Sequence, residues 1–359
     1  MTEVGVDPLD LVDRGALTAF LAGCVEPFDQ LTVTLLAGGA SNLTYLVQLD
    51  DRRYVLRRRP LGPSAPKAHD MRREFTVLDA LKGRGLPIPR VHAFSEDEDV
   101  VGAPFYLMDF RPGHVLHSPA DAEGLSPAQA EQCSGQLIDI LARLHALSPE
   151  QLQLPNFGRP EGFLERRVRS WLRQWNSVEH RAFPEVERIG ELLLRNLPEQ
   201  RYTALVHGDY RLGNVILDVE DGGASITAVL DWEMSTAGDP LTDVAHLLVY
   251  WEPTCGRVTH PAQQIAERPG FLSGAELVRL YEEKTDRDLS GLPFYLAFEH
   301  WRAAIIKDAI YLRRAPGQTQ AEEFGATVRL HLDEAVQILD SLGFDTQSVA
   351  PVGTTKENE

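Results

Sequence analysis

The stretch VHGDYRLGN, residues 206–214, constrains the fold and function of this chain more than any other part of it. It follows the short apolar run 204–206, which predicts a buried strand, and it carries four closely spaced polar side chains: His207, Asp209, Arg211 and Asn214. Glycine, aspartate and asparagine are common in turns, so an ordinary turn is one interpretation. A loop that presents catalytic groups at the end of a buried strand is the other.

The residues after this stretch favour the catalytic interpretation. Two further strands are predicted in NVILD (214–218) and ITAVL (226–230), and the second ends at Asp231. The H-x-D-x4-N spacing is that of the catalytic loop of protein kinases, where a metal-binding aspartate follows. Two intervening strands would bring Asn214 and Asp231 to one edge, and their oxygens suit Mg²⁺. We therefore expect Asp209 to orient the acceptor hydroxyl and accept its proton, and Asn214 and Asp231 to be metal ligands.

The composition limits the partners of the chain. Its formal net charge of -18 argues against nucleic acid or an anionic membrane surface as a main partner. No window approaches the roughly 18 apolar residues of a membrane span, and the acidic N-terminus does not resemble a secretory signal. Its three cysteines are too widely spaced for a zinc pair or a disulfide framework. We expect a cytoplasmic globular protein, monomeric or homodimeric, with no nucleic-acid or membrane partner.

The first 110 residues predict a small, mainly antiparallel sheet with one internal helix. Alternating apolar residues and turn signals predict strands at 31–36, 43–49, 54–58, 91–94 and 104–110. Helical spacing of apolar residues predicts a leading helix at 8–26 and the internal helix at 70–82. This segment is expected to be an N-terminal nucleotide-binding lobe, residues 1–110.

From about residue 120 the pattern becomes helical, interrupted by the strands around the polar stretch. Helices are predicted at 128–147, 163–176, 185–196, 241–251, 274–286, 293–314 and 321–341. The expected fold class is α+β, with a large, mainly helical C-terminal lobe that carries a short β insertion, residues 111–345. The polar tail, residues 346–359, is predicted to be disordered.

Several motifs together resemble a known superfamily. AGGASNLTYLV, YVLRRRP, HDMRRE, FYLMDFRPG, HGDYRLGN and AGDPLTD occur in this order along nearly the whole chain. The set resembles the aminoglycoside phosphotransferase and choline kinase superfamily, and it is most similar to the kinase-like domain associated with acyl-CoA dehydrogenases. The resemblance implies a bilobal protein-kinase-like fold, a phosphotransferase with an alcohol group as acceptor, and ATP (or GTP) and Mg²⁺ as cofactors.

The resemblance also implies which residues bind the phosphates of the nucleotide. The AGGASN loop would approach them through backbone N–H groups, with contributions from Gly38, Gly39, Ser41 and Asn42. Arg57 stands where kinases carry a phosphate-holding lysine, and it can bind phosphate through its forked guanidinium. Its expected partner is Glu74 in the helix MRREF. An ordinary glycine-rich hairpin and a solvated helix charge are the alternatives.

The base of the nucleotide is assigned to the motif FYLMDFRPG. Met108 would line the adenine pocket, and the backbone from Asp109 to Arg111 would pair with the base edge. A plain strand that leads into a turn is the alternative. In the catalytic loop, His207 would brace the backbone, whereas Arg211 is open between contacting the transferring phosphate and forming a surface salt bridge.

These motifs do not identify the molecule that accepts the phosphoryl group. Two helical segments, 163–176 and 301–315, are rich in basic residues, namely Arg166, Arg167, Arg169, Arg173, Arg302, Lys307, Arg313 and Arg314. A CoA ester, which carries several phosphate charges, would explain such runs in an acidic chain, and solvated faces paired with local acids are the alternative. The dehydrogenase-associated branch is implicated in phosphorylating hydroxyacyl-CoA thioesters, so a small hydroxyl substrate, with acyl-CoA favoured, is the hypothesis.

Two other functions stay open at this point. An aminoglycoside or choline-type kinase would need an acidic or aromatic pocket for its cation. A nucleotide-binding pseudokinase with a regulatory role would be expected to lack Asp209, Asn214 or Asp231, and all three are present. The arginine at position 57 is the feature in its favour.

Overall fold

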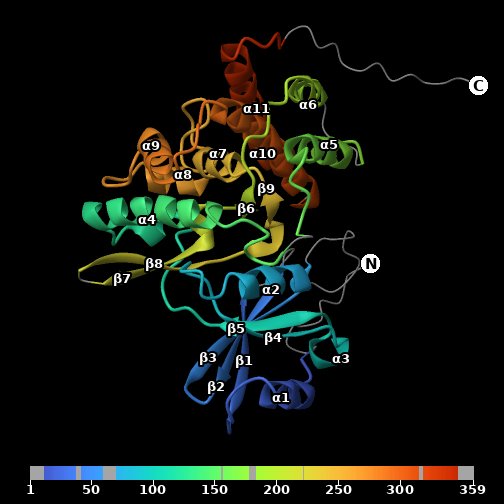
Figure 1. The fold of residues 1–359 in the computed structure, drawn as a ribbon, viewed down its shortest axis with the longest axis vertical. Helices are drawn as coiled ribbons and strands as arrows, with labels where there is room; N and C mark the ends of the chain where they lie inside the picture. Colours follow the sequence, from blue (N-terminus) through green and yellow to red (C-terminus); the bar gives the residue numbers. More distant parts are fainter. Residues whose placement is uncertain are drawn as a thin grey trace, which may run out of the picture. The chain divides into compact units, whose positions relative to one another are not determined.

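The computed structural model describes residues 12–37, 42–59, 70–154, 157–177, 183–220, 222–314 and 318–346. The chain folds into two compact units, whose elements are shown in Figure 1. The N-terminal unit contains the described residues up to His114, together with Asn214–Asp218 and Ile226–Ser235. The C-terminal unit contains Val115–Gly213, Val219–Ser225 and the described residues from Thr236 onward. Most of the predicted tail therefore lies outside the described residues.

The N-terminal unit is built on an antiparallel five-stranded sheet in the order β1-β2-β3-β5-β4. The strands are β1 (Leu31–Ala37), β2 (Leu43–Leu49), β3 (Arg52–Arg58), β4 (Val91–Ser95) and β5 (Phe105–Asp109). Their register pairs Arg57 with Tyr106 and Val55 with Met108. The sheet thus fixes Arg57 and Met108 on neighbouring central strands.

Alternation along β2 places one set of its side chains in the core. Leu43, Tyr45, Val47 and Leu49 are buried, and the residues between them are more exposed. Leu17 and Leu21 of α1 (Arg14–Ala22) belong to the same apolar cluster. The apolar face of this helix therefore covers one side of the sheet, which stabilises it by burial.

Two further helices complete this unit. Helix α2 (Met71–Ala80) begins at Asp70, whose carboxylate accepts a hydrogen bond from Arg73 N, and it packs on β4 and β5. Helix α3 (Glu98–Val101) is a single turn that ends at Gly102, where φ is 79° and glycine is favoured. The prediction of one internal helix omitted α3, because four residues give no periodic signal.

The C-terminal unit is mainly helical (Figure 1). Its α-helices are α4 (Pro127–His145), α5 (Phe163–Trp175), α6 (Glu185–Arg195), α7 (Leu241–Val249), α8 (Pro261–Ala266), α9 (Gly274–Thr285), α10 (Leu292–Arg314) and α11 (Gln318–Ser341). The long helices α10 and α11 pack together, α7 packs on α10, and α4 packs on α9. None of the helices described here is both long and apolar enough to cross a membrane.

The short strands of the predicted β insertion form two small sheets. Strand β6 (Ala204–Val206) pairs antiparallel with β9 (Thr236–Gly238), and all of β6 is buried. Strands β7 (Val215–Glu220) and β8 (Gly223–Val229) pair with each other. The polar stretch 206–214 leaves β6 and enters β7 through the 3₁₀ turn η2 (Leu212–Asn214).

Candidate active site

The backbone of the polar loop is held by Asp243, in the first turn of α7. Its carboxylate accepts hydrogen bonds from His207 N at 2.6 Å and Gly208 N at 2.8 Å, and its side chain is fully buried. Burial alone would raise the pKa of Asp243. The hydrogen bond and the charge of His145, together with the contacts of His207, outweigh the effect of burial and lower this pKa. Asp243 thus clamps the start of the loop as a carboxylate.

His207 and Gly208 set the direction of the loop. His207 is buried, and its Nδ1 accepts a hydrogen bond of 3.2 Å from Asp209 N, so the ring contacts the backbone two residues further along the loop. Gly208 has φ of 85°, a left-handed conformation that a side chain would strain. Together they turn the chain so that the side chain of Asp209 is about a quarter exposed, at 24%.

The carboxylate of Asp209 has two basic neighbours. Its Oδ1 lies 2.8 Å from Nε2 of His246 and 3.2 Å from Nε of Arg211. The Arg211 guanidinium also lies over the ring of Tyr250, 5.4 Å from its centroid. Arg211 therefore forms an ion pair with Asp209, and its contact with the transferring phosphate stays a prediction.

His246 belongs to a buried chain of charged groups that the sequence did not reveal. Its Nδ1 lies 3.0 Å from Oε2 of Glu299, whose Oε1 lies 2.8 Å from Nη1 of Arg302. Arg302 in turn donates to Gly208 O at 3.4 Å. Glu299 is 2% and Arg302 is 5% exposed, so this chain of contacts runs from the loop into the interior of the helical unit.

The charged groups of this buried network shift the pKa of one another. Burial and Arg302 act to lower the pKa of His246, but the hydrogen bonds with Asp209 and Glu299 outweigh them and raise it. Burial would raise the pKa of Glu299, yet Arg302 and His246 lower it. The raised pKa of His246 and of Arg302 and the lowered pKa of Glu299 each favour the charged form of the group.

Further basic groups lie near the same loop. Burial lowers the pKa of Lys307 to about 8, and its Nζ donates to Thr259 O at 2.7 Å. Burial, with Lys307 and Arg211, lowers the pKa of His260 to about 3. Burial, with Arg302, lowers the pKa of Arg167 to about 10. Burial is the main cause of all three shifts, to which Lys307 and Arg211 add at His260 and Arg302 adds at Arg167.

The arginines of α5 are divided between solvent and interior. Arg169 forms an i,i+4 pair with Glu165 in which both side chains are exposed, and Arg166 donates to the backbone carbonyls of Arg159 and Glu161. Arg167 lies over the ring of Phe163, and Arg302 of α10 lies over the ring of Trp171. The side chains of Arg313 and Arg314 lie outside the described residues.

In the N-terminal unit, Arg57 joins two acidic residues. Its Nη1 lies 2.6 Å from Oε1 of Glu74, and its Nη2 lies 3.4 Å from Oδ1 of Asp231. Glu74 is fully buried, whereas the side chain of Asp231 is 33% exposed. Burial raises the pKa of Glu74 against the effect of Arg57, and Glu74 raises the pKa of Arg57 against the effect of burial.

The neighbouring arginines follow the strand alternation. Arg58 is fully buried and donates to the hydroxyl of Tyr45 on the core face of the sheet. Arg59 forms an exposed pair with Glu98. Of these three consecutive arginines, Arg57 is the one that contacts Glu74 and Asp231.

Asn214 and Asp231 are brought together by the β7–β8 hairpin. Leu230 N donates to Asn214 O at 2.8 Å, so Asn214 lies beside the residue that precedes Asp231. Asp231 has φ of 66°, the left-handed region. Among the described residues there is no cluster of three or more His, Cys, Asp or Glu that could hold a metal. An amide and a partly exposed carboxylate still fit Mg²⁺, which often takes one or two carboxylates and completes its shell with phosphate and water.

The residues that are predicted to bind the base of the nucleotide lie at the end of β5. Met108 lines a small cavity of about 10 Å³ with Arg57, Glu74 and Asp231. Asp109 N and Phe110 N donate within the unit to Arg90 O and Arg53 O. The side chains of Asp109 and Arg111 lie 3.6 Å apart. The predicted contact of this backbone with a base edge would thus use Arg111 N–H as its donor.

The glycine-rich loop is described only at its end. Asn42 is buried, and its Nδ2 donates to Oε2 of Glu233 at 3.1 Å. Gly38, Gly39 and Ser41 lie outside the described residues. Asn42 therefore contacts a residue two positions after Asp231, within the same unit.

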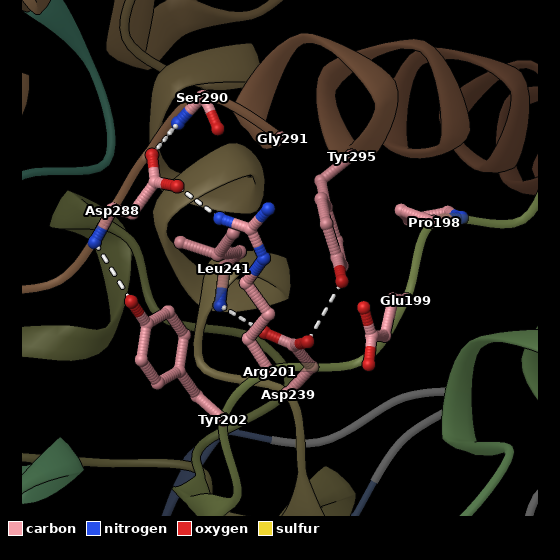
Figure 2. Close-up of a pocket in the computed structure, with 10 residues that line it drawn as sticks. All are labelled: Pro198, Glu199, Arg201, Tyr202, Asp239, Leu241, Asp288, Ser290, Gly291 and Tyr295. Atoms are coloured by element: carbon pink, nitrogen blue, oxygen red, sulfur yellow. Dashed lines mark hydrogen bonds and ion pairs between the residues drawn. The ribbon is translucent and has the colours of Figure 1, made fainter.

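A larger cavity of about 150 Å³ lies in the C-terminal unit (Figure 2). Asp239 faces it, but its carboxylate accepts hydrogen bonds from Leu241 N at 3.0 Å and from the hydroxyl of Tyr295 at 2.7 Å. Arg201 and Asp288 form an ion pair across the same cavity. Asp239 is thus bonded on both sides, and no predicted site residue is among those that line the cavity, so Asp239 fits a structural role just before α7.

Comparison with known proteins identifies the family. Residues 32–277 match the family described as "Phosphotransferase enzyme family". The chain is 35% identical over 320 residues to mouse acyl-CoA dehydrogenase family member 10, covering 86% of this chain and 29% of that protein. It is 33% identical over 326 residues to human acyl-CoA dehydrogenase family member 11, covering 88% of this chain and 41% of that protein. The chain thus spans less than half the length of these relatives.

Solved structures show the same fold. A protein assigned as an aminoglycoside phosphotransferase from Ralstonia eutropha is 28% identical, with a TM-score of 0.74 over 90% of this chain and 98% of that one. Aminoglycoside phosphotransferase APH(4)-Ia, solved with ADP and hygromycin B, is 15% identical with a TM-score of 0.60 over 90% and 98% of the two chains. The resemblance indicated by the motif order and the predicted α+β, kinase-like fold class are both confirmed. The chain belongs to the phosphotransferase enzyme family and is a phosphotransferase.

Proposed function

We propose that this phosphotransferase transfers the γ-phosphate of ATP or GTP, with Mg²⁺, to a hydroxyl group of a small anionic metabolite, and that a hydroxyacyl-CoA thioester is the favoured acceptor. Asp209 is the base that orients the hydroxyl and accepts its proton. Asn214 and Asp231 hold Mg²⁺, which neutralises charge on the phosphate oxygens when bound.

The contacts of Arg57 support the nucleotide part of the proposal. An arginine in this position can bind phosphate bidentately, and Glu74 holds its guanidinium from the buried side at 2.6 Å. Met108 then lines the adenine pocket, and the backbone from Asp109 to Arg111 binds the base edge. The AGGASN loop, with Gly38, Gly39, Ser41 and Asn42, binds the phosphates through backbone N–H groups.

The charge around Asp209 is the observation that carries the choice of acceptor. Arg211 and His246 contact its carboxylate, and Arg302 lies behind them. Lys307 adds to the positive field, and it is one of the cations that, with burial, lower the pKa of His260. The cationic side chains around Asp209 would repel an aminoglycoside or choline, whereas they would attract phosphates and carboxylates. In this proposal Arg211 contacts the transferring phosphate in addition to Asp209.

The names of the relatives point in the same direction. Two relatives that align with most of this chain are named acyl-CoA dehydrogenase family members. These names refer to acyl-CoA, and an acyl-CoA that carries a hydroxyl group can accept a phosphoryl group. The proposal extends this acceptor class to the present chain.

A panel of acceptors tests the proposal directly. Purified protein is incubated with Mg-ATP or Mg-GTP and 4-hydroxypentanoyl-CoA, free 4-hydroxypentanoate, kanamycin or choline, and products are identified by mass spectrometry. We expect a phosphoryl group on the thioester and less on the free acid, since the acid lacks the phosphates of CoA. Phosphorylation of kanamycin or choline, with none on the thioester, would overturn the acceptor class.

The pseudokinase alternative makes a different prediction for the same protein. It rests on the arginine at position 57, yet this arginine forms the ion pair with Glu74. A pseudokinase would be stabilised by Mg-nucleotide in thermal unfolding and would phosphorylate no member of the panel. Turnover on any acceptor excludes it.

A further inference from the structure

His246 lies between two carboxylates. Nε2 is 2.8 Å from Oδ1 of Asp209, and Nδ1 is 3.0 Å from Oε2 of Glu299. An ionised carboxylate can only accept hydrogen bonds, so both ring nitrogens must donate. The geometry therefore requires an imidazolium, unless one carboxyl group carries the proton instead.

We propose that His246 is a positioning residue for Asp209: its Nε2–H fixes Oδ1 at 2.8 Å, so that Oδ2, which Arg211 Nε contacts at the longer distance of 3.4 Å, is the oxygen that meets the acceptor hydroxyl. The inference rests on the proposed function, because it takes Asp209 as the base. Glu299 holds the far side of the ring, and Arg302 holds Glu299 at 2.8 Å. His246 has 2% of its surface exposed, so water does not compete for these contacts.

This arrangement also fixes where the proton goes. An imidazolium that donates from both nitrogens has no site for another proton, so His246 does not relay the proton away from Asp209. The hydroxyl proton moves to Oδ2 of Asp209, the acceptor oxygen forms its bond to the γ-phosphorus, and the bond from phosphorus to the bridging oxygen breaks to release the nucleoside diphosphate. Every atom and charge in this step comes from the acceptor, the nucleotide and Asp209.

The groups that face His246 come from three elements. Asp209 approaches from the loop and Glu299 and Arg302 from α10, and Tyr250, the residue that follows α7, has its ring centroid 4.8 Å away. The raised pKa of His246 agrees with an imidazolium, although burial and Arg302 oppose it. Arg302 also donates to Gly208 O, so the same chain of charges holds the backbone just before Asp209.

Two substitutions separate the two donors of the ring. His246→Gln keeps a donor near the position of Nε2, toward Asp209, whereas His246→Asn keeps one near Nδ1, toward Glu299. We expect His246→Gln to keep kcat on 4-hydroxypentanoyl-CoA within about fivefold of wild type. His246→Asn should lower kcat about 10- to 100-fold with little change in KM for the nucleotide. Equal losses of kcat in the two variants would overturn the proposal, since a packing role does not distinguish them.

A matched control and a spectroscopic readout complete the test. His331→Gln removes another buried histidine, which bonds to His300, and should leave kcat unchanged. ¹⁵N NMR of the wild-type imidazole should show both nitrogens of His246 protonated at pH 7, and Asp209→Asn should shift the Nε2 resonance. A neutral ring, or an Nε2 resonance that has the same chemical shift in Asp209→Asn as in wild type, would refute the proposal even if no acceptor in the panel is phosphorylated. Failure of the whole panel would count against the proposed function alone.

Discussion

Asp231 in the N-terminal unit and Asp209 in the C-terminal unit are both partly exposed aspartates beside an arginine, yet their surroundings differ in charge. Asp231 shares Arg57 with the buried Glu74, so two carboxylates face one guanidinium. Asp209 is contacted by both Arg211 and His246. The first group carries an excess of negative charge and the second an excess of positive charge.

The difference matches two different partners. An excess of carboxylates favours a divalent cation, and Asp231 with Asn214 can supply oxygen ligands to Mg²⁺. An excess of cations favours an anionic acceptor. Two aspartates of the same chemical type thus suit different tasks because of the charges that surround them.

Asp209→Asn should give the largest effect. The amide cannot accept the hydroxyl proton, so we expect kcat to fall about 10³-fold, within the range attributed to a general base. Initial rates of thioester phosphorylation measure this, and the thermal unfolding temperature reports on folding. Full turnover by the variant would remove Asp209 from the mechanism and with it the contrast between the two aspartates.

Asp231→Asn should act through the metal. Loss of one carboxylate removes the excess of negative charge, so we expect about 100-fold lower turnover and a higher Mg²⁺ concentration for half-maximal rate. The rate is measured as Mg²⁺ is titrated. Asp218→Asn, which removes a carboxylate from the same hairpin, serves as the control and should leave the Mg²⁺ dependence unchanged. An unchanged Mg²⁺ dependence in Asp231→Asn would show that Asp231 is not a ligand.

The sequence predicted the main elements because their signals are local. Alternation of apolar residues in LTYLVQL predicted the strand 43–49, which is β2 (Leu43–Leu49). Helix α8 (Pro261–Ala266) was missed because six residues cannot show a helical period. Strand β9 (Thr236–Gly238) was missed because its residues are not typical of strands, and only its pairing with β6 defines it.

The candidate site was predictable where spacing carries it. Asp209 and Asn214 lie within one loop, but His246 and Glu299 come from α7 and α10, and no sequence spacing links helices that meet only in the fold. A signal did exist: Glu299 and Arg302 interrupt an apolar helix, and His246 follows Asp243 by one turn. Such charges are informative when they are buried, and burial is known only from the structure.

A pH series tests the positive field around Asp209. The folded protein lowers the pKa of His260 to about 3, well below its ordinary value of 6.5, through burial, Lys307 and Arg211. Its contribution to stability is therefore complete above pH 6.5 and is lost as the pH falls toward 3. Between pH 7.5 and 5.0 we expect wild type to lose about 1 kcal/mol more unfolding free energy than His260→Asn, after allowing for partial exposure. Asparagine keeps an acceptor for Ala262 N without titrating.

Urea denaturation at each pH provides this measurement, and NMR titration of His260 provides its control. Arg211→Gln removes one of the cations that lower the pKa of His260, so this pKa should rise toward its ordinary value. A pKa of His260 that stays the same in Arg211→Gln would contradict the excess of positive charge assigned to the surroundings of Asp209.

The smallest effect is expected at Arg169, which separates solvated arginines from those that shape the acceptor site. Its pair with Glu165 is exposed on both sides, at 55% and 44%, and such pairs contribute only about 0.3–0.5 kcal/mol to stability. Arg169→Ala should therefore change KM for the CoA thioester less than about twofold, because screening by salt weakens an exposed charge. The comparison variant is Arg211→Gln, whose arginine contacts Asp209, and it should raise this KM several-fold at low salt. A larger effect at Arg169 than at Arg211 would place the recognition of the thioester on the exposed face of α5.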